Sequence, residues 1–358
     1  MALDVLLALE WYDHQLHRGV AQVAARAGWH LTCPSGTPGF QPVPPGWRGD
    51  GAITLVGNRW LERLRRRGTP LVDVGLTSST RVPRTVVDNV AVARLAYRHF
   101  RDRGWRRLAC LSIPQVRMFD ERVTAYRALA AAEHLDCPLW SMAELVKNLT
   151  TAAPVAVFAV QDGIGAEALA VARRLGLAVP DQVAVIGVDD VDLICTALPV
   201  PLASVDTDQE GLGVAAAQRL DAILTGRPDD GQLIRHAPRR VIARPSAEAL
   251  GVSHPGLRCA IALAQADPTH TVHALALAAG LSAQGLDLVC QRELGQAPGA
   301  ILRQLRLRRA GDLLASGSTL GEAATHAGLA SASGLCALVR RDLGLTPGQW
   351  RQQLRQPR

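Results

Sequence analysis

Apolar and polar residues follow two alternating patterns along the first 245 positions of the chain. Short apolar runs, typical of buried strands, alternate with longer stretches in which apolar residues recur at helical spacing. This alternation predicts an α/β domain with mostly parallel strands covered on both faces, as one domain or two similar lobes. The predicted strands cover residues 3–9, 52–56, 71–74, 107–111, 155–160 and 183–188, and the predicted helices cover 16–27, 90–102, 122–134, 164–175 and 212–224.

The pattern changes near residue 245. Proline, glycine and serine gather in residues 244–255, and this composition predicts a linker, which we place at 246–253. Beyond it no strand pattern returns. We therefore expect a first domain at 1–245 and an all-α domain at 254–358.

The C-terminal part contains an internal duplication. The segment RELGQAPGAILRQLR at 292–306 matches RDLGLTPGQWRQQLR at 341–355 in eight of fifteen positions. Upstream, an alanine followed by Gly-Leu recurs at 276–281 and 324–329. A repeat of this length indicates one supersecondary unit built twice.

Each copy is predicted to be a short helix, a tight turn and a second helix. The turns are placed at Gly280 and Gly328, and the second helices begin after the capping residues Ser282 and Ser331. This is helix-turn-helix geometry, in which the second helix can enter a major groove of DNA. A long helix at 298–316 is expected to connect the two units.

Composition and charge narrow the function classes. The net charge is +7 in 358 residues, and residues 251–358 contribute +5 of it, with 11 arginines, no lysine and six acidic residues. A basic helical module suggests a polyanionic partner, although an arginine-rich solvated surface would give the same count. No apolar run reaches the ~18 residues of a membrane span, and we expect no secretory leader. Seven singly scattered cysteines fit a reduced cytoplasm and disfavour a zinc site.

Residues of the C-terminal part resemble the AraC-type DNA-binding domain. That family carries two helix-turn-helix units, a central helix with an Arg-Leu-x-x-Ala-x-x-Leu-Leu signature, and a closing Gly-x-x-Pro-x-x-[Tyr/Trp]-Arg. The matching residues here are Arg306, Leu307, Ala310, Leu313 and Leu314, followed by Gly344, Pro347, Trp350 and Arg351.

The first 245 residues resemble the sugar-sensing core of LacI-type repressors. The matching segments are AVQDGIGAEAL at 159–169, VAVIGVDD at 183–190, VPLASVDTD at 200–208 and VIARPS at 241–246. A LacI-like core followed by an AraC-type tail is similar to the xylose-operon regulator family, as are WYDHQ at 11–15, VDN at 87–89 and DERVTAYR at 120–127.

This resemblance implies a two-lobed periplasmic-binding-protein-like domain with parallel sheets, followed by an all-α domain with two helix-turn-helix units. It implies a cytoplasmic transcription regulator, not an enzyme, that uses no cofactor or metal. The implied partners are double-stranded DNA, a small sugar such as D-xylose or another pentose, a second copy of the chain in a homodimer, and RNA polymerase. A periplasmic sugar-binding protein shares the sensor fold but would need an export signal and no basic tail.

Sugar hydroxyls require donors and acceptors held at strand ends, and Asp and Arg supply both. By resemblance, the effector-contacting residues are Asp13, Arg122, Gln161, Asp162 and Asp189. Asp162 precedes a helix, so capping that helix is its alternative role. Asp189 and Asp190 are adjacent and point to opposite sides, which makes them a poor catalytic pair.

Two patterns imitate other sites. Gly163-x-Gly165-x-x-Ala168 after a predicted strand resembles a dinucleotide fingerprint, and a nicotinamide-dependent enzyme is the function it would indicate. The preceding Asp162 would repel a pyrophosphate. His14 and His17 could ligate a metal, but no third ligand lies nearby, and surface histidines are the simpler interpretation.

The two predicted recognition helices, at 283–294 and 332–343, depart from the AraC-type pattern. Leu288 and Ala337 stand where that family often has a long polar residue, and Cys290 and Val339 replace its phenylalanines. Arginine reads guanine through a bidentate fork that leucine and alanine lack. The residues left to contact DNA are Gln284, Asp287, Arg292, Ser333, Arg340 and Arg341, with the arginines expected on phosphates. A sugar sensor with weak or lost specific DNA binding is therefore the alternative function.

Overall fold

The computed structural model describes residues 2–35, 41–76, 81–114, 116–252 and 254–355. The chain forms two compact units, the first from residues 1–99 and 108–248 and the second from residues 100–107 and 249–358. The sequence-based boundary placed residues 100–107 in the first domain, whereas in the structure they group with the second unit.

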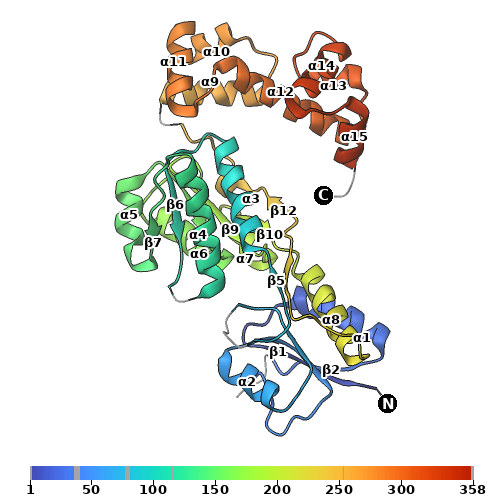
Figure 1. Ribbon diagram of the computed structural model, residues 1–358. Helices are drawn as coiled ribbons and strands as arrows, with labels where there is room; N and C mark the ends of the chain where they lie inside the picture. The colour runs from blue at the N-terminus through green and yellow to red at the C-terminus, as the bar shows by residue number, and fades with distance from the viewer. Residues whose placement is uncertain (1, 36–40, 77–80, 115, 253, 356–358) are drawn as a thin grey trace. The chain divides into compact units, whose positions relative to one another are not determined.

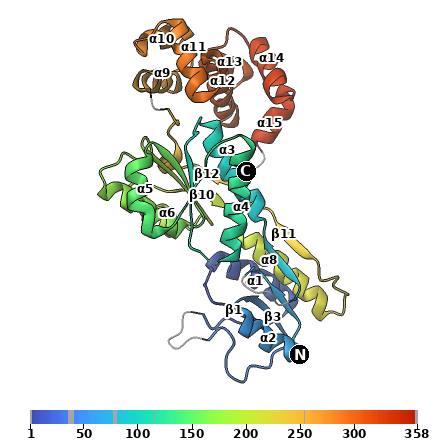
Figure 2. The same cartoon turned by 60° about the vertical axis from the view of Figure 1, so that its left-hand side comes forward.

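The first unit contains two sheets, each with helices on its faces (Figures 1 and 2). The first sheet has the strand order β11-β5-β4-β3-β1-β2, and all of its pairings are parallel. Its strands are β1 (Asp4–Leu9), β2 (His30–Thr32), β3 (Gly51–Leu55), β4 (Leu71–Asp73), β5 (Arg84–Val87) and β11 (Leu233–His236), and its helices are α1 (His14–Ala27), α2 (Asn58–Arg66) and α8 (Gln209–Leu224).

The second sheet has the order β12-β10-β9-β8-β6-β7, with β12 antiparallel to β10 and the other pairings parallel. Its strands are β6 (Leu108–Leu111), β7 (Leu139–Trp140), β8 (Val155–Ala159), β9 (Val183–Val188), β10 (Ala203–Asp206) and β12 (Arg240–Ile242). The accompanying helices are α3 (Asn89–Asp102), α4 (Arg117–Ala132), α5 (Leu145–Ala152), α6 (Asp162–Arg174) and α7 (Asp192–Cys195), with short 3-10 turns at Met142–Glu144 and Pro245–Ala247.

The two sheets are the cores of two lobes, and the chain connects these lobes three times: after β5, after β10 and between β11 and β12. After the second of these connections the chain forms α8, which packs against α1. The two helices approach each other closely at a glycine in each. A Cβ at Gly19 would meet the carbonyl of Glu210, and a Cβ at Gly213 would meet the carbonyl of Leu16. The predicted two-lobed architecture with mostly parallel sheets is confirmed.

The second unit is helical and contains two hydrophobic cores. Its helices are α9 (Pro255–Ala266), α10 (Val272–Ala278), α11 (Ala283–Leu294), α12 (Pro298–Ala315), α13 (Leu320–His326), α14 (Ala332–Leu343) and α15 (Pro347–Arg355). Helices α9 to α11 surround one core and α13 to α15 the other, while α12 runs between them (Figure 1). Leu302 of α12 belongs to the first core, and Leu307 and Leu314 belong to the second. The predicted connecting helix and both helix-turn-helix units are confirmed.

Arg306 has a structural role in α12. Arg306 is half-buried and donates to the carbonyls of Pro268 and His270, at 2.9 and 3.2 Å. It therefore ties α12 to the loop between α9 and α10.

The described part of the expected linker packs against both units at its ends. Ser246 is fully buried and donates to the carbonyl of Val185 at 2.7 Å, inside the first unit. In the second unit, the Gly251 amide donates to the carbonyl of Arg103, and the Trp105 indole donates to the carbonyl of Ala249. Residue 253 lies outside the described residues.

Among the described residues, no single helix is long and apolar enough to span a membrane. Helices α10 and α11 reach the required length only as a pair, and they are bent by 85° to one another.

Candidate functional site

A pocket of about 490 Å³ lies between the two sheets of the first unit. Several of its lining residues lie within four residues after the end of a strand: Tyr12 and Asp13 after β1, Val74 after β4, Gln161 after β8 and Asp189 after β9. Ligands of parallel α/β sheets bind outside the carboxyl ends of the strands, and this pocket occupies that place. Its walls are mostly apolar, with a small number of polar groups directed inward.

Arg122 of α4 is held from three sides at this pocket. Its side chain is 1% exposed and donates to the Asn89 amide oxygen at 2.8 Å, to the Val160 carbonyl at 2.6 Å and to the Asp189 carboxylate at 3.4 Å. Its guanidinium also lies 5.9 Å from the centre of the Phe119 ring. A cation fixed in this way pays little entropy when it binds a ligand.

Asp189 is the anionic partner of Arg122. It follows β9 in an unusual backbone conformation, with φ of 100°, and its carboxylate also accepts from the Thr207 hydroxyl at 3.4 Å. The next residue, Asp190, turns the other way and forms an ion pair with Arg244 at 2.8 Å. The prediction that the two adjacent carboxylates point to different sides agrees with these partners.

Asp13 and Gln161 line the pocket from helix N-termini. The Asp13 carboxylate accepts from the Leu16 amide at 2.8 Å and caps α1, so it combines a structural bond with a place in the lining. Gln161 occupies the N-cap position of α6, makes no side-chain capping bond and is exposed.

Asp162 was predicted to contact the effector, and the structure corrects this prediction. It is fully buried and is absent from the pocket lining, because its carboxylate turns inward and accepts from the Ser204 hydroxyl at 2.6 Å and from the Val191 amide at 2.8 Å. It is the first residue of α6 and does not cap that helix, so the alternative role is also not observed. Burial, followed by the neighbouring Asp189 carboxylate, raises the pKa of Asp162 to about 7.

The structure adds pocket residues that were not predicted as contacts. Trp11 and Tyr12 are 55% and 56% exposed at the pocket, and Phe119, Asn89 and Gln209 complete the wall. Exposed aromatic side chains beside a pocket are unusual for a structural role. The segments WYDHQ and VDN carried the signal for Trp11, Tyr12 and Asn89.

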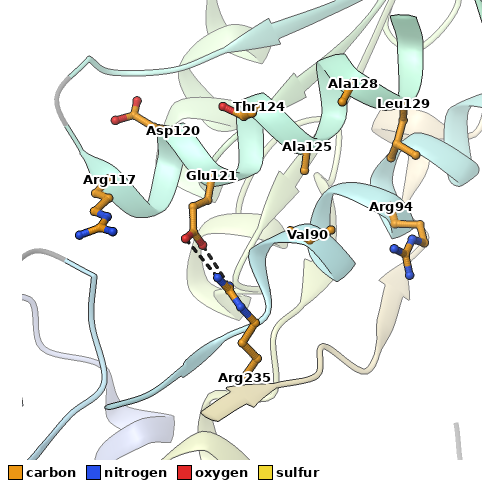
Figure 3. Close-up of a pocket in the computed structure, with 10 residues that line it drawn as sticks. All are labelled: Val90, Arg94, Arg117, Asp120, Glu121, Thr124, Ala125, Ala128, Leu129 and Arg235. Carbon is orange, nitrogen blue, oxygen red and sulfur yellow. Dashed lines mark hydrogen bonds and ion pairs between the residues drawn. The ribbon is translucent and has the colours of Figure 1, made fainter. Parts of the chain in front are cut away.

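A second pocket, of about 570 Å³, lies along α3 and α4 (Figure 3). Small apolar residues such as Ala125 and Ala128 face Val90 there. Glu121 of α4 pairs with Arg235 of β11 at 3.1 and 3.2 Å, which joins the two lobes beside the first pocket. Burial acts against ionisation of Glu121, but the bonds from Arg235 and Asn89 outweigh it and lower its pKa.

The structure explains the two sequence patterns that imitate a dinucleotide site and a metal site. A Cβ at Gly165 would meet Leu202 at 3.0 Å, so this glycine permits close packing of α6. The buried Asp162 carboxylate puts a negative charge in the first turn of α6, where a pyrophosphate would have to bind. Among the described residues no cluster of His, Cys, Asp or Glu could hold a metal ion, and the ring of His17 contacts the Tyr12 hydroxyl at 3.1 Å.

The recognition helices α11 and α14 have the predicted bounds. On α11, Gln284, Leu288 and Arg292 are exposed and Asp287 is half-buried. On α14, Ser333, Arg340 and Arg341 are exposed. Ser333 contacts the capping Ser331 hydroxyl at 2.7 Å, and Arg341 pairs with Asp342 at 2.7 Å. Each helix therefore presents a short row of the predicted DNA-contacting side chains to solvent.

Comparisons with known proteins find a matching family for each of the two units. A family model described as a periplasmic binding protein-like domain matches residues 97–247, and one described as a helix-turn-helix domain matches residues 275–353. The xylose operon regulatory protein of Escherichia coli (strain K12) is 26% identical over 334 residues, which cover 85% of this chain and 84% of that protein. The HTH-type transcriptional regulator CelR of Thermobifida fusca is 35% identical over 153 residues, covering 39% and 45% of the two chains.

A solved structure described as a xylose-binding transcription activator has the same fold along the whole chain. It covers 99% of this chain and 98% of its own, with a TM-score of 0.63 and 23% sequence identity. The two domain matches show a periplasmic binding protein-like domain followed by a helix-turn-helix domain, and the similarity along most of both chains agrees with the resemblance to the xylose-operon regulator family.

Proposed function

We propose that this protein is a transcription regulator that binds a small sugar in the pocket between its lobes and binds double-stranded DNA through its two helix-turn-helix units. The observation that carries the proposal is one chain with both parts: a pocket with the fixed Arg122–Asp189 pair, and two capped recognition helices. A sugar that stabilises one arrangement of the lobes shifts the population of DNA-binding states only through different affinities for those states.

The polar groups of the pocket suit a neutral polyol. Arg122 and Asp189 contribute one positive and one negative charge, while Asn89, Gln161 and Gln209 supply amide donors and acceptors. Asp13 adds a further acceptor to the lining. The effector we propose is D-xylose or another pentose, because the similar Escherichia coli protein is named for xylose.

The DNA-binding side of the proposal divides the exposed residues into two roles. Gln284 and Asp287 of α11 are assigned to base edges, because glutamine is suited to adenine and aspartate to the amino group of cytosine. Arg292, Arg340 and Arg341 are suited to phosphates. Ser333 lies at the start of α14, where recognition helices contact bases.

One observation favours a second candidate function, a sugar sensor with weak or lost specific DNA binding. The central outward positions of the recognition helices are Leu288, which is 65% exposed, and the exposed Ala337. Neither side chain can form a hydrogen bond to a base.

Assembly and location complete the proposal. We expect a homodimer, activation of genes for sugar breakdown with RNA polymerase as a partner, and action in the cytoplasm, where the DNA is. We expect no enzymatic activity, no cofactor and no metal. A fluorescence titration with NADH checks the nicotinamide-enzyme alternative and should show no saturable binding.

The first test is a thermal-shift screen of pentoses and hexoses on the purified protein. A sugar present at 100 times its Kd stabilises the folded state by about 2.7 kcal/mol, enough to raise Tm by a few degrees. Asp189→Ala should abolish the shift. Asp192→Ala, which removes an exposed carboxylate three residues away, should retain it. No shift with any sugar would contradict the sensor assignment.

The second test separates the two DNA hypotheses. Sequences selected from a random duplex library are compared with unselected DNA by fluorescence anisotropy, at several salt concentrations and with or without the sugar. Specific regulators bind their sites about 10³-fold or more tightly than other DNA. Selection that enriches no sequence would favour the sensor without specific DNA binding.

A further inference from the structure

The turn that carries Asp189 is held in a strained backbone conformation. Asp189 and Asp190 have φ values of 100° and 50°, in the left-handed region that residues with a side chain rarely occupy. Consecutive residues of this kind persist only where the surrounding structure fixes them. The bonds that fix this turn therefore determine where the Asp189 carboxylate lies.

Two of the three amides of this turn are bound by a buried side-chain network. The Val191 amide donates to one carboxylate oxygen of Asp162 at 2.8 Å. The Asp190 amide donates to the Ser204 hydroxyl at 3.0 Å, and that hydroxyl donates to the other oxygen of Asp162 at 2.6 Å. The third amide, of Asp189, donates to the carbonyl of Val205 at 3.0 Å.

We propose that Asp162 is a positioning residue of the effector pocket, which fixes the turn 189–191 so that the Asp189 carboxylate faces Arg122 and the bound sugar. This inference rests on the proposed function. It assigns to Asp162 a role through Asp189, without contact to the sugar.

Two further features of the fold are explained by this role. A Cβ at position 187 would collide with the Asp162 carboxylate, so Gly187 in β9 leaves the room that the carboxylate occupies. Asp162 is also the first residue of α6, a helix of 13 residues, whose N-terminal dipole favours a negative charge there.

Burial of Asp162, together with the charges around it, makes the network sensitive to pH. Asp189 faces it across the turn, Asp190 is paired with Arg244, and the Cys195 thiol of α7 bonds to it. The remaining charge nearby is Arg122 of α4, which is paired with Asp189.

Burial and the Asp189 charge raise the pKa of Asp162 to about 7. The ionised carboxylate accepts from Val191 and Ser204 at once. A protonated one must donate to Ser204, whose hydroxyl hydrogen then loses its acceptor in this network. The network is therefore complete above pH 7 and weakened below it.

The first experiment measures sugar Kd against pH, from about pH 5.5 to about pH 8.5, for the full-length protein and two variants. The probe is D-xylose, or the pentose or hexose that gives the largest thermal shift. We expect wild-type affinity to fall about tenfold on acidification through pH 7, as for the loss of one hydrogen bond to a charged group. Asp162→Asn should bind about tenfold more weakly at high pH and show a flat profile. Asp192→Asn, the same change at an exposed carboxylate, should behave as wild type.

The second experiment needs no sugar. Hydrogen exchange of the peptide covering residues 189–191 is compared in wild type, Asp162→Asn and Ser204→Ala, with the peptide covering α1 as an internal reference. Faster exchange confined to the turn in both variants supports the positioning role. Unchanged exchange of the turn overturns it, whatever the sugar results are.

The outcomes keep the two proposals separate. A wild type that binds sugar, with Asp162→Asn of equal affinity and equal pH dependence, overturns the positioning role and leaves the sensor function intact. A wild type that binds no sugar contradicts the sensor function, and hydrogen exchange then decides the role of Asp162.

Discussion

The two helix-turn-helix units are copies of one sequence repeat, and their scaffolds are nearly the same. Helices α11 and α14 each have 12 residues, each is capped by a serine that accepts from the amide three residues later, and each ends at a left-handed glycine. The capping serines are Ser282 and Ser331, and the closing glycines are Gly295 and Gly344. These serines and glycines fix the backbone at the two ends of each helix, and both copies of the repeat contain them.

The outward faces differ. Helix α11 exposes Gln284 and Leu288 with Asp287 beside them, while α14 exposes small residues at its start and two arginines at its end. We propose that one scaffold serves two modes of DNA contact, in which the first copy contributes most of the base contacts, through Gln284 and Asp287, and the second copy most of the phosphate contacts, through Arg340 and Arg341. Four predictions test this comparison.

The largest expected effect is a difference in stability cost between alanine substitutions in the turns of the two units. Gly280 and Gly328 have φ of 65° and 73°, but a Cβ would meet nothing within 4 Å at Gly280, whereas at Gly328 it would lie 2.6 Å from Thr269 Cα. Gly280→Ala should cost about 1 kcal/mol from the left-handed backbone alone. Gly328→Ala should cost about 3 kcal/mol or more, because the loop at Thr269 must also move. Hydrogen exchange of α11 and α14 measures each cost, and equal costs would contradict this account.

The second prediction concerns base and phosphate contacts. Gln284→Ala should cost about 1–3 kcal/mol on the selected DNA and relax preference at one base pair, since a bidentate contact is lost. Arg340→Ala should weaken selected and unselected DNA alike and reduce the salt slope by about one. Anisotropy titrations at several salt concentrations distinguish these patterns. A sequence-specific loss at Arg340 would remove the proposed division between the copies.

The third prediction tests Leu288, the exposed apolar side chain on the face of α11. An apolar side chain in the major groove can recognise only the methyl group of thymine. Replacing thymine by deoxyuridine in the selected DNA should weaken wild-type binding by about 1 kcal/mol at one position. Leu288→Ala should bind both DNAs equally, and Ala337→Gly in α14 is the matched control. Equal wild-type binding to both DNAs would show that Leu288 does not read a base.

The smallest effect concerns the first helices of the two units. Thr319 and Glu322 form a capping box at α13, while α10 has Thr271 as a cap and Ala274 in the place of the glutamate. The bond from the Thr319 backbone amide lowers the pKa of Glu322. Its stabilisation is therefore present above the usual pKa of a glutamate and is lost as the pH falls through the lowered value. The protection of α13 amides, measured against their intrinsic exchange rates, should fall on acidification while that of α10 does not, and Glu322→Ala should abolish the difference.

The sequence predicted the elements whose residues carry a local signal. The six central strands are continuous apolar runs, and the helix-turn-helix units have serine caps and turn glycines in sequence. The strands it missed are the four edge strands, β2, β7, β11 and β12, and two inner strands of four residues, β5 and β10. Strand β7 has two residues, β2 has three, and β11 is exposed along most of its length. Such strands are defined by pairing with a neighbour and leave little pattern of their own.

The pocket was predicted in part for the same reason. Asp13, Gln161 and Asp189 lie at strand ends or helix starts, where the chain pattern and the family resemblance both indicated them. Arg122 was expected to open a helix, but α4 begins five residues earlier, at Arg117, so Arg122 lies within the helix. The inward turn of Asp162 depends on Ser204 and Val191, which lie 42 and 29 residues away in sequence. Spacing along the chain cannot show which of two neighbouring polar residues faces a cavity.

The segment around Trp105 limits how this protein can be divided or recombined. Trp105 is 2% exposed, and its indole is bonded to Ala249, so residues from the middle of the sensor sequence complete the helical unit. A DNA-binding fragment cut at the apparent linker would leave that tryptophan behind. Exchange of tails between related regulators, by a laboratory or by recombination in a genome, would then transfer an incomplete module.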